Sequence, residues 1–230
     1  MNSPLTNETG ITKRPIIAVW FSCGAASAMA AKLTLEKYRD THDVMIVNNP
    51  VDEEGEDNIR FKEDISKWLN HEILTARNPL YNTTSAVVIW DESKYMCGLK
   101  GAPCTVKLKK EARYAFEKKY MIAHHVLGFT VEEKHRHKRF VEGERLNTLP
   151  ILIEAGYTKE MCLQEISDAG IQLPEAYRLG MPNANCFGCV KATSPTYWNL
   201  IRKIRPDVFQ KRLEQSYRLG ARLVRYKGKR

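Results

Sequence analysis

Residues 15–38, PIIAVWFSCGAASAMAAKLTLEKY, contain the pattern that decides the fold. The run at 15–21 is apolar and rich in β-forming side chains, which predicts a buried strand. Small residues follow at 22–27, and residues 28–38 carry apolar side chains at helical spacing. A strand that leads through such a turn into a helix directs backbone N–H groups toward one point, where phosphate can bind. The alternative interpretation is an ordinary tight turn packed against the sheet.

Strands and helices alternate along the next hundred residues. Strands are predicted at 43–49, 71–76 and 121–129, and helices at 56–70, 105–119 and 131–140. This alternation predicts an α/β fold, in which helices flank a mostly parallel sheet. Ligands of such sheets bind at the carboxyl ends of the strands, so three segments become candidate binding stations: 22–27, 48–52 and 128–133.

The pattern changes after about residue 145. Thr158 and Gly170 delimit a further helix, and two more helices are separated just before Pro206. We therefore expect three parts, which are a flexible arm at 1–14, a nucleotide-binding α/β domain at 15–145, and a C-terminal helical region with cysteines and a basic tail at 146–230.

The net charge of +9 is concentrated at the C-terminal end. Residues 200–230 contain 11 Lys or Arg and 2 acids, while residues 1–199 contain 25 of each sign. Five of the last nine residues are basic, with Tyr217 and Tyr226 near them, a composition that suits nucleic acid. The alternative is a solvated tail. The chain has no apolar run long enough to span a membrane and no secretory leader, so we expect a cytoplasmic location without membrane partners.

The six cysteines are therefore expected to be reduced. Cys186 and Cys189 form a Cys-x-x-Cys motif around a glycine, and Cys104 begins a predicted helix whose N-terminal dipole favours a thiolate. These three are candidate ligands of zinc or an iron–sulfur cluster. Cys97 is either a fourth ligand or a buried apolar residue. Cys162 is expected in the core, and Cys23 is either packed or a second reactive thiol.

Two groups of basic residues follow candidate stations. Lys109, with Lys107 and Lys110, lies just past Cys104, where it could neutralise a phosphate or a cluster. Arg136, with Arg139, follows the strand that ends near Gly128 and could clamp pyrophosphate. The alternative for both groups is the solvated charged face of a helix. Cys104, Lys109 and Arg136 are the candidate catalytic residues.

The segment Ser22–Ser27 resembles the S-G-G-x-D-S/T loop of the adenine nucleotide α-hydrolase superfamily, which includes the PP-loop ATP pyrophosphatases and the phosphoadenylylsulfate (PAPS) reductases. Three positions match, whereas Cys23 replaces the first glycine and Ala26 replaces the acid. Four later segments resemble small PAPS reductase-like proteins, often encoded by phages, in order over residues 15–205: VNNPVDEEGEDNIRFKEDISKWLN, GLKGAPCTVKLKKEA, GFTVEEKHRHKRF and NCFGCVKA. The nucleotide-binding residues that this resemblance implies are Ser22, Cys23, Gly24, Ala25, Ala26, Ser27, Asn48, Asn49, Gly128, Phe129 and Thr130.

The resemblance implies an ATP-dependent sulfurtransferase. Such an enzyme adenylates an acceptor, here tRNA or DNA, with Mg²⁺ and release of pyrophosphate, and it draws on a sulfur donor protein. A [4Fe–4S] cluster is favoured over Zn²⁺, since three cysteine ligands leave one iron open for a sulfur species. One rival is a PAPS or APS reductase, although no cysteine follows Cys189. Another is a non-catalytic zinc module that binds nucleic acid, which the missing acid at Ala26 would suit.

Overall fold

The computed structural model describes residues 14–145 and 147–225. In this part of the chain, five parallel strands form a sheet in the order β3-β2-β1-β4-β5. The strands are β1 (Ile16–Phe21), β2 (Asp43–Asn48), β3 (Ile73–Thr75), β4 (Ile122–Val126) and β5 (Thr148–Leu149). The predicted α/β class is therefore confirmed. Residues 1–13 of the expected arm and 226–230 of the expected basic tail lie outside the described residues.

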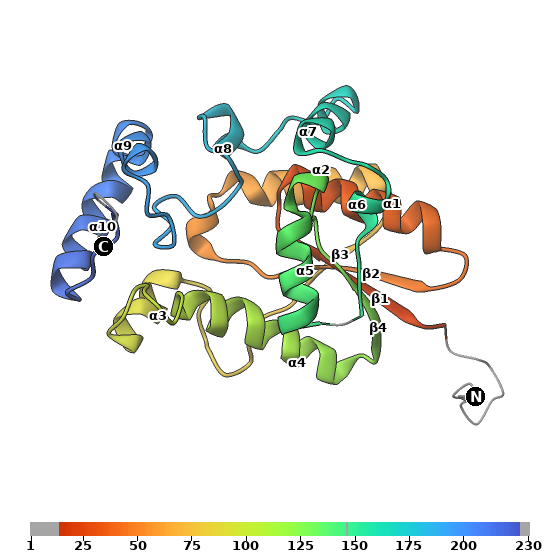
Figure 1. Cartoon of the computed structure of the whole chain (residues 1–230), viewed down its shortest axis with the longest axis horizontal. Coiled ribbons are helices and arrows are strands. Elements are labelled where there is room, and N and C mark those ends of the chain that lie inside the picture. The colour runs from red at the N-terminus through yellow and green to blue at the C-terminus, as the bar shows by residue number, and fades with distance from the viewer. Residues whose placement is uncertain (1–13, 146, 226–230) are drawn as a thin grey trace.

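Helices cover both faces of the sheet (Figure 1). Their bounds are α1 (Ala25–Tyr38), η1 (Asp52–Glu54), α2 (Asp57–Leu69), α3 (Ala86–Ser93), η2 (Thr105–Lys110), α4 (Glu111–Lys119), η3 (Val131–Glu133), α5 (Lys134–Gly143), α6 (Ile151–Glu154), α7 (Lys159–Asp168), α8 (Glu175–Arg178), α9 (Pro195–Ile204) and α10 (Pro206–Arg218). In the described residues, no helix is long and apolar enough to cross a membrane.

The central strand β1 divides the core into two layers. Every residue of β1 is buried, as expected for a strand with helices on both sides. Because successive side chains of a strand alternate between faces, Ile17, Val19 and Phe21 pack with α1, α2, α6 and α7. Ala18 and Trp20 point to the other face, toward Phe116 of α4. The sheet therefore holds the loop after β1 between two packed layers.

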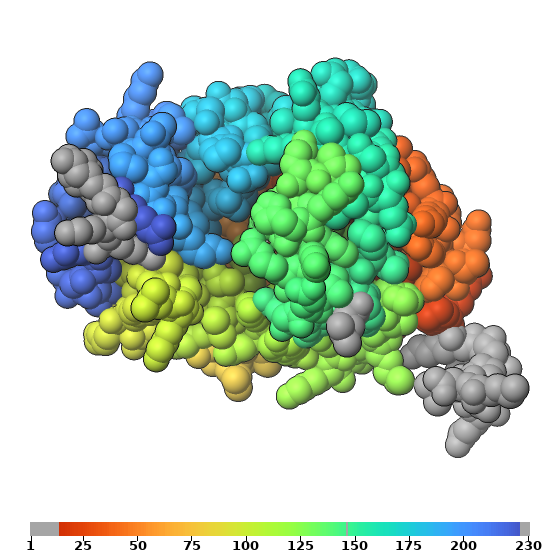
Figure 2. Space-filling view, in the orientation of Figure 1, coloured from red at the N-terminus to blue at the C-terminus, as the bar shows by residue number. Residues whose placement is uncertain are grey.

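The sheet continues past the proposed boundary at residue 145. Strand β5 pairs with β4, and Ile151 and Ile166 of the following helices belong to the same core as α1. Helices α9 and α10 instead share a second core with α3, built around Trp90 and Trp198. Figure 1 shows these C-terminal helices at one end of the molecule beside α3, and in Figure 2 the blue C-terminal surface lies at the same end, next to the yellow surface. The division into domains stays a proposal.

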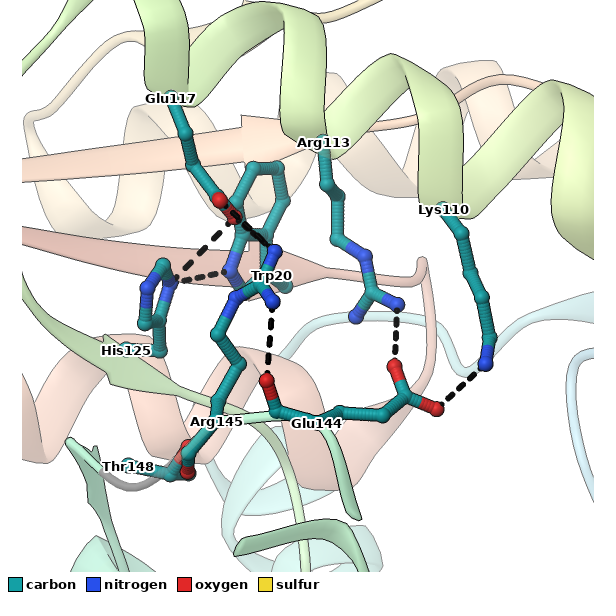
Figure 3. A network of polar contacts seen from close by, with 8 residues as sticks. All are labelled: Trp20, Lys110, Arg113, Glu117, His125, Glu144, Arg145 and Thr148. Atoms are coloured by element: carbon teal, nitrogen blue, oxygen red, sulfur yellow. Dashed lines mark hydrogen bonds and ion pairs between the residues drawn. The ribbon is translucent and has the colours of Figure 1, made fainter.

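A network of polar side chains connects the sheet to the helix η2–α4 (Figure 3). His125 on β4 accepts a hydrogen bond at Nδ1 from Trp20 Nε1 at 3.1 Å. Burial, followed by the charges of Arg145 and Arg113, lowers the pKa of His125 to about 4. The ring is therefore neutral near pH 7. On the helix side, Arg145 binds Glu117 at 2.7 Å and completes the connection.

Tertiary contacts account for the elements that differ from expectation. Helix α3 was not predicted; its N-cap Ser85 and the N–H of Ala86 both bind the Glu53 carboxylate at 2.7 Å, from a distant part of the chain. No helix was predicted for the segment that contains the short helix α8. The first part of the predicted helix 105–119 is a π-helix, η2, a form often found at functional sites.

Candidate functional site

The loop between β1 and α1 is closed by the hydroxyl of Ser27. Ser27 Oγ accepts the backbone N–H groups of Ser22 at 3.1 Å and Gly24 at 3.3 Å, and it donates to Gly24 O at 2.8 Å. Two N–H groups of the loop are thereby occupied within the protein. The N–H groups of the first helical turn, from Ala25 onward, have no partner within the helix and are those that a phosphate could use.

Cys23 supports this loop from inside. It adopts a φ of 55°, in the left-handed region, and its side chain is buried. Burial, with a further contribution from Glu54, raises the pKa of the Cys23 thiol to about 12. The thiol therefore stays protonated, which favours packing over a second reactive thiol. Asn48 of β2 braces the same loop, because its Nδ2 donates to Phe21 O at 2.9 Å and to Cys23 Sγ at 3.5 Å.

The segment after β4 packs directly on the loop. A Cβ placed on Gly128 would lie 2.7 Å from Ser27 N and 2.8 Å from the carbonyl carbon of Ala26, so only glycine allows this approach. Thr130 is buried, and Asn49 donates to Ala76 O at 3.0 Å. The three candidate stations therefore meet at one edge of the sheet, with the side chains of Asn48 and Asn49 engaged by the protein backbone.

Phe129 and Arg136 lie farther out. The guanidinium of Arg136 lies 5.6 Å from the centre of the Phe129 ring, and it forms an ion pair with Glu133 at the start of α5. Arg136 is exposed, with 56% of its side chain accessible. To reach a nucleotide it would have to leave Glu133.

An ion pair with a buried carboxylate and a partly accessible ammonium group lies between the loop and the cysteines. Glu54 of η1 is buried and binds the ammonium group of Lys109 from η2. Burial alone would lower the pKa of Lys109, but Glu54, Cys186 and Cys189 together raise it. Besides burial, the charges of Glu54 and Lys109 shift the pKa of Cys23 in the Ser22–Ser27 loop and also that of Cys186 in the Cys-x-x-Cys motif. The ion pair therefore lies within electrostatic reach of both parts of the candidate site.

The Cys-x-x-Cys loop is held from three sides. Phe187 N donates to Glu53 O at 3.0 Å, which attaches the loop to η1. Tyr197 of α9 accepts from Cys189 N at 2.8 Å and donates to Cys186 O at 3.2 Å. Gly188 has a φ of 67°, and a Cβ there would meet Arg212 and Val208 of α10 at 3.0 and 2.9 Å. The loop therefore has one defined shape.

Three of the four candidate ligands lie within electrostatic reach of one another: besides burial, charge on Cys189 or Cys104 raises the pKa of Cys186, and charge on Cys189 raises that of Cys104. Burial raises the pKa of the Cys186 thiol well above its ordinary value, with Glu54, Cys189 and Cys104 as further causes and Lys109 opposing them. Cys97 packs beside the same apolar cluster as Cys104 and Cys186 but is not among the main groups that shift their pKa values. In the described ranges, no three such side chains already stand in a metal-binding arrangement. A bound metal would have to draw the sulfurs inward.

Unpaired N–H groups beside the three thiols fit a sulfur-rich group. Trp90 Nε1 is buried without a hydrogen-bond partner of ordinary length in residues 14–145 and 147–225, and its N–H opposes the burial that raises the pKa of Cys104. Arg212 Nε is also buried without a hydrogen-bond partner among the described residues, and the Arg212 guanidinium lies 4.6 Å from the centre of the Trp90 ring. Thiolates and cluster sulfides accept such hydrogen bonds. The donor set therefore fits an iron–sulfur cluster or zinc.

Sequence reasoning missed several residues of this site. Arg212 is 5% exposed, yet its sequence surroundings, KRLEQSY, are those of an ordinary charged helix. Glu54 lies in an acidic run that is typical of a surface. The aromatic residues Trp90, Tyr177 and Tyr197 carry no local signal either. Each of these residues reaches the candidate site through a contact with residues that are distant in the chain, and a single sequence does not reveal such contacts.

The comparisons support the fold. No protein-family model matches the chain, and no curated protein is detectably similar in sequence. Among solved structures, the chain is similar to the U34-tRNA thiolase NcsA from Methanococcus maripaludis, described with its [4Fe–4S] cluster. The two chains are 12% identical, with a TM-score of 0.51, and the match covers 93% of this chain and 72% of the thiolase. The likeness shows that the two chains share their α/β fold, a parallel sheet flanked by helices.

Proposed function

We propose that this protein is an ATP-dependent sulfurtransferase-type enzyme that adenylates an acceptor and uses a cysteine-bound iron–sulfur cluster. The observation that carries the proposal is the Glu54–Lys109 pair, whose charges act both on Cys23 of the Ser22–Ser27 loop and on Cys186, beside the hydrogen bond from Phe187 N to Glu53 O. The similarity to a tRNA thiolase that contains a cluster supports this combination on one fold.

The loop would position ATP for adenylation. An acceptor oxygen attacks the α-phosphorus and forms a new P–O bond, while the bond from that phosphorus to the oxygen shared with the β-phosphate breaks. Pyrophosphate leaves with that oxygen, and Mg²⁺ offsets its charge. The first N–H groups of α1 bind phosphate oxygens, and Lys109 supplies positive charge from the cysteine side. Arg136 can add a second cation once it leaves Glu133.

Cys104, Cys186 and Cys189 would hold the cluster, with Cys97 as the candidate fourth ligand. Such a cluster would supply iron at which a sulfur species can bind. Trp90 Nε1 and Arg212 Nε would donate hydrogen bonds to its sulfurs, and Lys109 would balance the negative charge of the thiolates. Zn²⁺ bound by the same thiols is the alternative occupant.

The acceptor would be tRNA or DNA, bound through the basic C-terminal end. Part of the charge there is used inside the protein, since Arg205 pairs with Asp207 and Arg218 with Asp91. Exposed cations in the described part of that end include Arg202, Lys203, Lys211 and Arg225. Arg225 donates its N–H to Thr193 O at 2.8 Å, so this residue lies next to the segment that follows Cys189. A sulfur donor protein completes the set of proposed partners.

The test combines metal analysis with pyrophosphate release. Protein purified without oxygen is analysed for iron, zinc and acid-labile sulfide, and pyrophosphate release from ATP is measured with and without tRNA or DNA. We expect iron with sulfide, and release that requires nucleic acid. Zinc without iron would remove the cluster, reduction of PAPS with thioredoxin would favour the reductase, and ATP turnover that never occurs would favour the zinc module.

Neighbouring lysines provide a matched pair of variants. Lys109→Gln removes the cation between the two halves of the site, whereas Lys110→Gln removes a lysine that binds Glu144 at 2.6 Å, away from the cysteines. We expect only the first to weaken ATP binding and iron retention, by about tenfold or more. The double variant Glu54→Gln/Lys109→Gln leaves no buried charge of this pair without its partner, so it separates loss of function from loss of folding.

A further inference from the structure

The hydroxyl of Tyr177 lies on the nucleotide loop. Tyr177 belongs to the short helix α8, far along the chain from β1 and α1. Its Oη would be 3.2 Å from a Cβ placed on Gly24, and the next atom that such a Cβ meets is Ser22 Oγ, at 3.9 Å. The tyrosine hydroxyl is therefore the nearest neighbour of the loop on the open side of Gly24.

The phenol oxygen faces the N–H groups that a phosphate would use. Burial raises the pKa of Tyr177, while the backbone N–H groups of Ala25 and Ala184 oppose the rise, because they point at its oxygen. Ala25 is the first residue of α1, and its N–H has no partner within the helix. The Tyr177 oxygen thus lies beside Gly24, next to the N–H that a phosphate oxygen would use.

We propose that the Tyr177 hydroxyl occupies the phosphate position of the Ser22–Ser27 loop, and that nucleotide binding displaces it. This inference rests on the proposed function, since it assumes that the loop binds a nucleotide. A charged phosphate oxygen forms a stronger hydrogen bond with an N–H group than a neutral phenol does. ATP can therefore displace the tyrosine, at the expense of part of its affinity.

Contacts on both sides hold α8 in the covering position. Asp57 accepts the N–H of Glu175 at 2.7 Å and is itself bound by Arg60. On the other side, Lys159 of α7 binds Asn183 Oδ1 at 3.2 Å, and its ammonium group lies 5.9 Å from the centre of the Tyr177 ring. These polar contacts exchange readily with water, so the segment can move while the main core stays intact.

Displacement of Tyr177 would also reach the cysteines. Tyr177 packs against the apolar cluster that contains Ala184 and Phe187, and Ala184 stands two positions before Cys186. Release of the hydroxyl from the loop therefore frees the residues that lead into the Cys-x-x-Cys loop. Nucleotide binding and the geometry of the cysteine site become coupled through one side chain.

The experiment compares ATP affinity in two tyrosine variants by isothermal titration calorimetry. Tyr177→Phe removes the competing oxygen and keeps the ring, and we expect its Kd for ATP to fall by about three- to tenfold, the value of one hydrogen bond. Tyr157→Phe is the matched control, because that hydroxyl binds Glu165 at 2.9 Å, away from the loop. Its Kd should equal that of the wild type.

Trypsin cleavage after Arg178 of α8 provides a second measurement. We expect ATP to accelerate this cleavage in the wild type, and Tyr177→Phe to be cleaved faster even without ATP. A Kd that rises or stays unchanged in Tyr177→Phe, or protection of Arg178 by ATP, would overturn the inference and leave the proposed function intact. Failure of both proteins to bind ATP would overturn the nucleotide assignment of the loop together with the inference.

Discussion

Gly128 offers a sharp test of how the segment after β4 supports the Ser22–Ser27 loop. In Gly128→Ala the new methyl group would lie 2.7 Å from Ser27 N, whereas an ordinary contact starts at 3.4 Å, so the two segments must separate by 3.4 − 2.7 = 0.7 Å. The neighbouring atoms belong to the backbone and cannot rotate away. Overpacking of this kind costs about 1–3 kcal/mol, so we expect the free energy of unfolding to fall by about 2 kcal/mol.

The separation should also move the N–H groups at the start of α1, and the affinity for ATP should fall by about tenfold or more. Urea unfolding followed by circular dichroism measures the first effect, and calorimetric titration with ATP the second. Gly143→Ala is the matched control, because a Cβ there meets no atom of the described residues within 4 Å. Gly128→Ala with wild-type stability and affinity would refute the packing argument; reduced stability with unchanged affinity would refute the role of the loop.

Three further predictions follow from other parts of the structure. His125 has a pKa of about 4 in the folded protein and 6.5 when unfolded, so the unfolded chain takes up its proton first as the pH falls. The stability of the wild type should therefore fall by about 3 kcal/mol between pH 6.5 and pH 4, a decrease that His125→Gln should not show, as measured by urea unfolding at each pH. Arg212→Gln should lower the iron content per chain, whereas Arg218→Gln, an exposed partner of Asp91, should not; equal iron contents would contradict the role of Arg212. Neutralising three exposed C-terminal cations should lower the slope of log affinity for nucleic acid against log salt by about 0.9 for each phosphate that the protein no longer neutralises. The triple variants to compare are Arg202→Ala/Lys203→Ala/Lys211→Ala and, as the control on α5, Lys134→Ala/Lys138→Ala/Arg139→Ala. A larger effect of the α5 variant on this slope would indicate that nucleic acid binds at α5 and not at the C-terminal helices.

Charge substitutions suit this last test better than truncation of the chain. Leu223 is buried in the core around Trp90, so deletion of residues 222–230 would remove a packing residue together with the charges. Weaker binding in that deletion would then mix two causes. Exposed lysines and arginines of α9 and α10 can be replaced with little effect on packing.

The sequence by itself determined the elements that follow from local patterns. The apolar run at 15–21 and the small residues after it predicted β1, the loop and α1, because burial on both faces requires continuous apolar side chains. Thr158 and Gly170 marked the ends of α7, where the Thr158 hydroxyl accepts the N–H of Met161 at 3.1 Å. The alternation of strands and helices predicted that the strands run parallel. Parallel strands end at the same edge of the sheet, which predicted where the candidate binding segments meet.

Only the tertiary structure decided which side chains share the site. Lys109 was a candidate from its place after Cys104, but its partner Glu54 comes from η1, and Arg212 arrives from the last helix of the described residues. Tyr177 of α8 reaches the Ser22–Ser27 loop. The physical reason is that the charge state and contacts of these groups depend on burial and on neighbours that are distant in the chain. Local periodicity places a residue on a face of its own helix, and the packing of whole elements places that face against another.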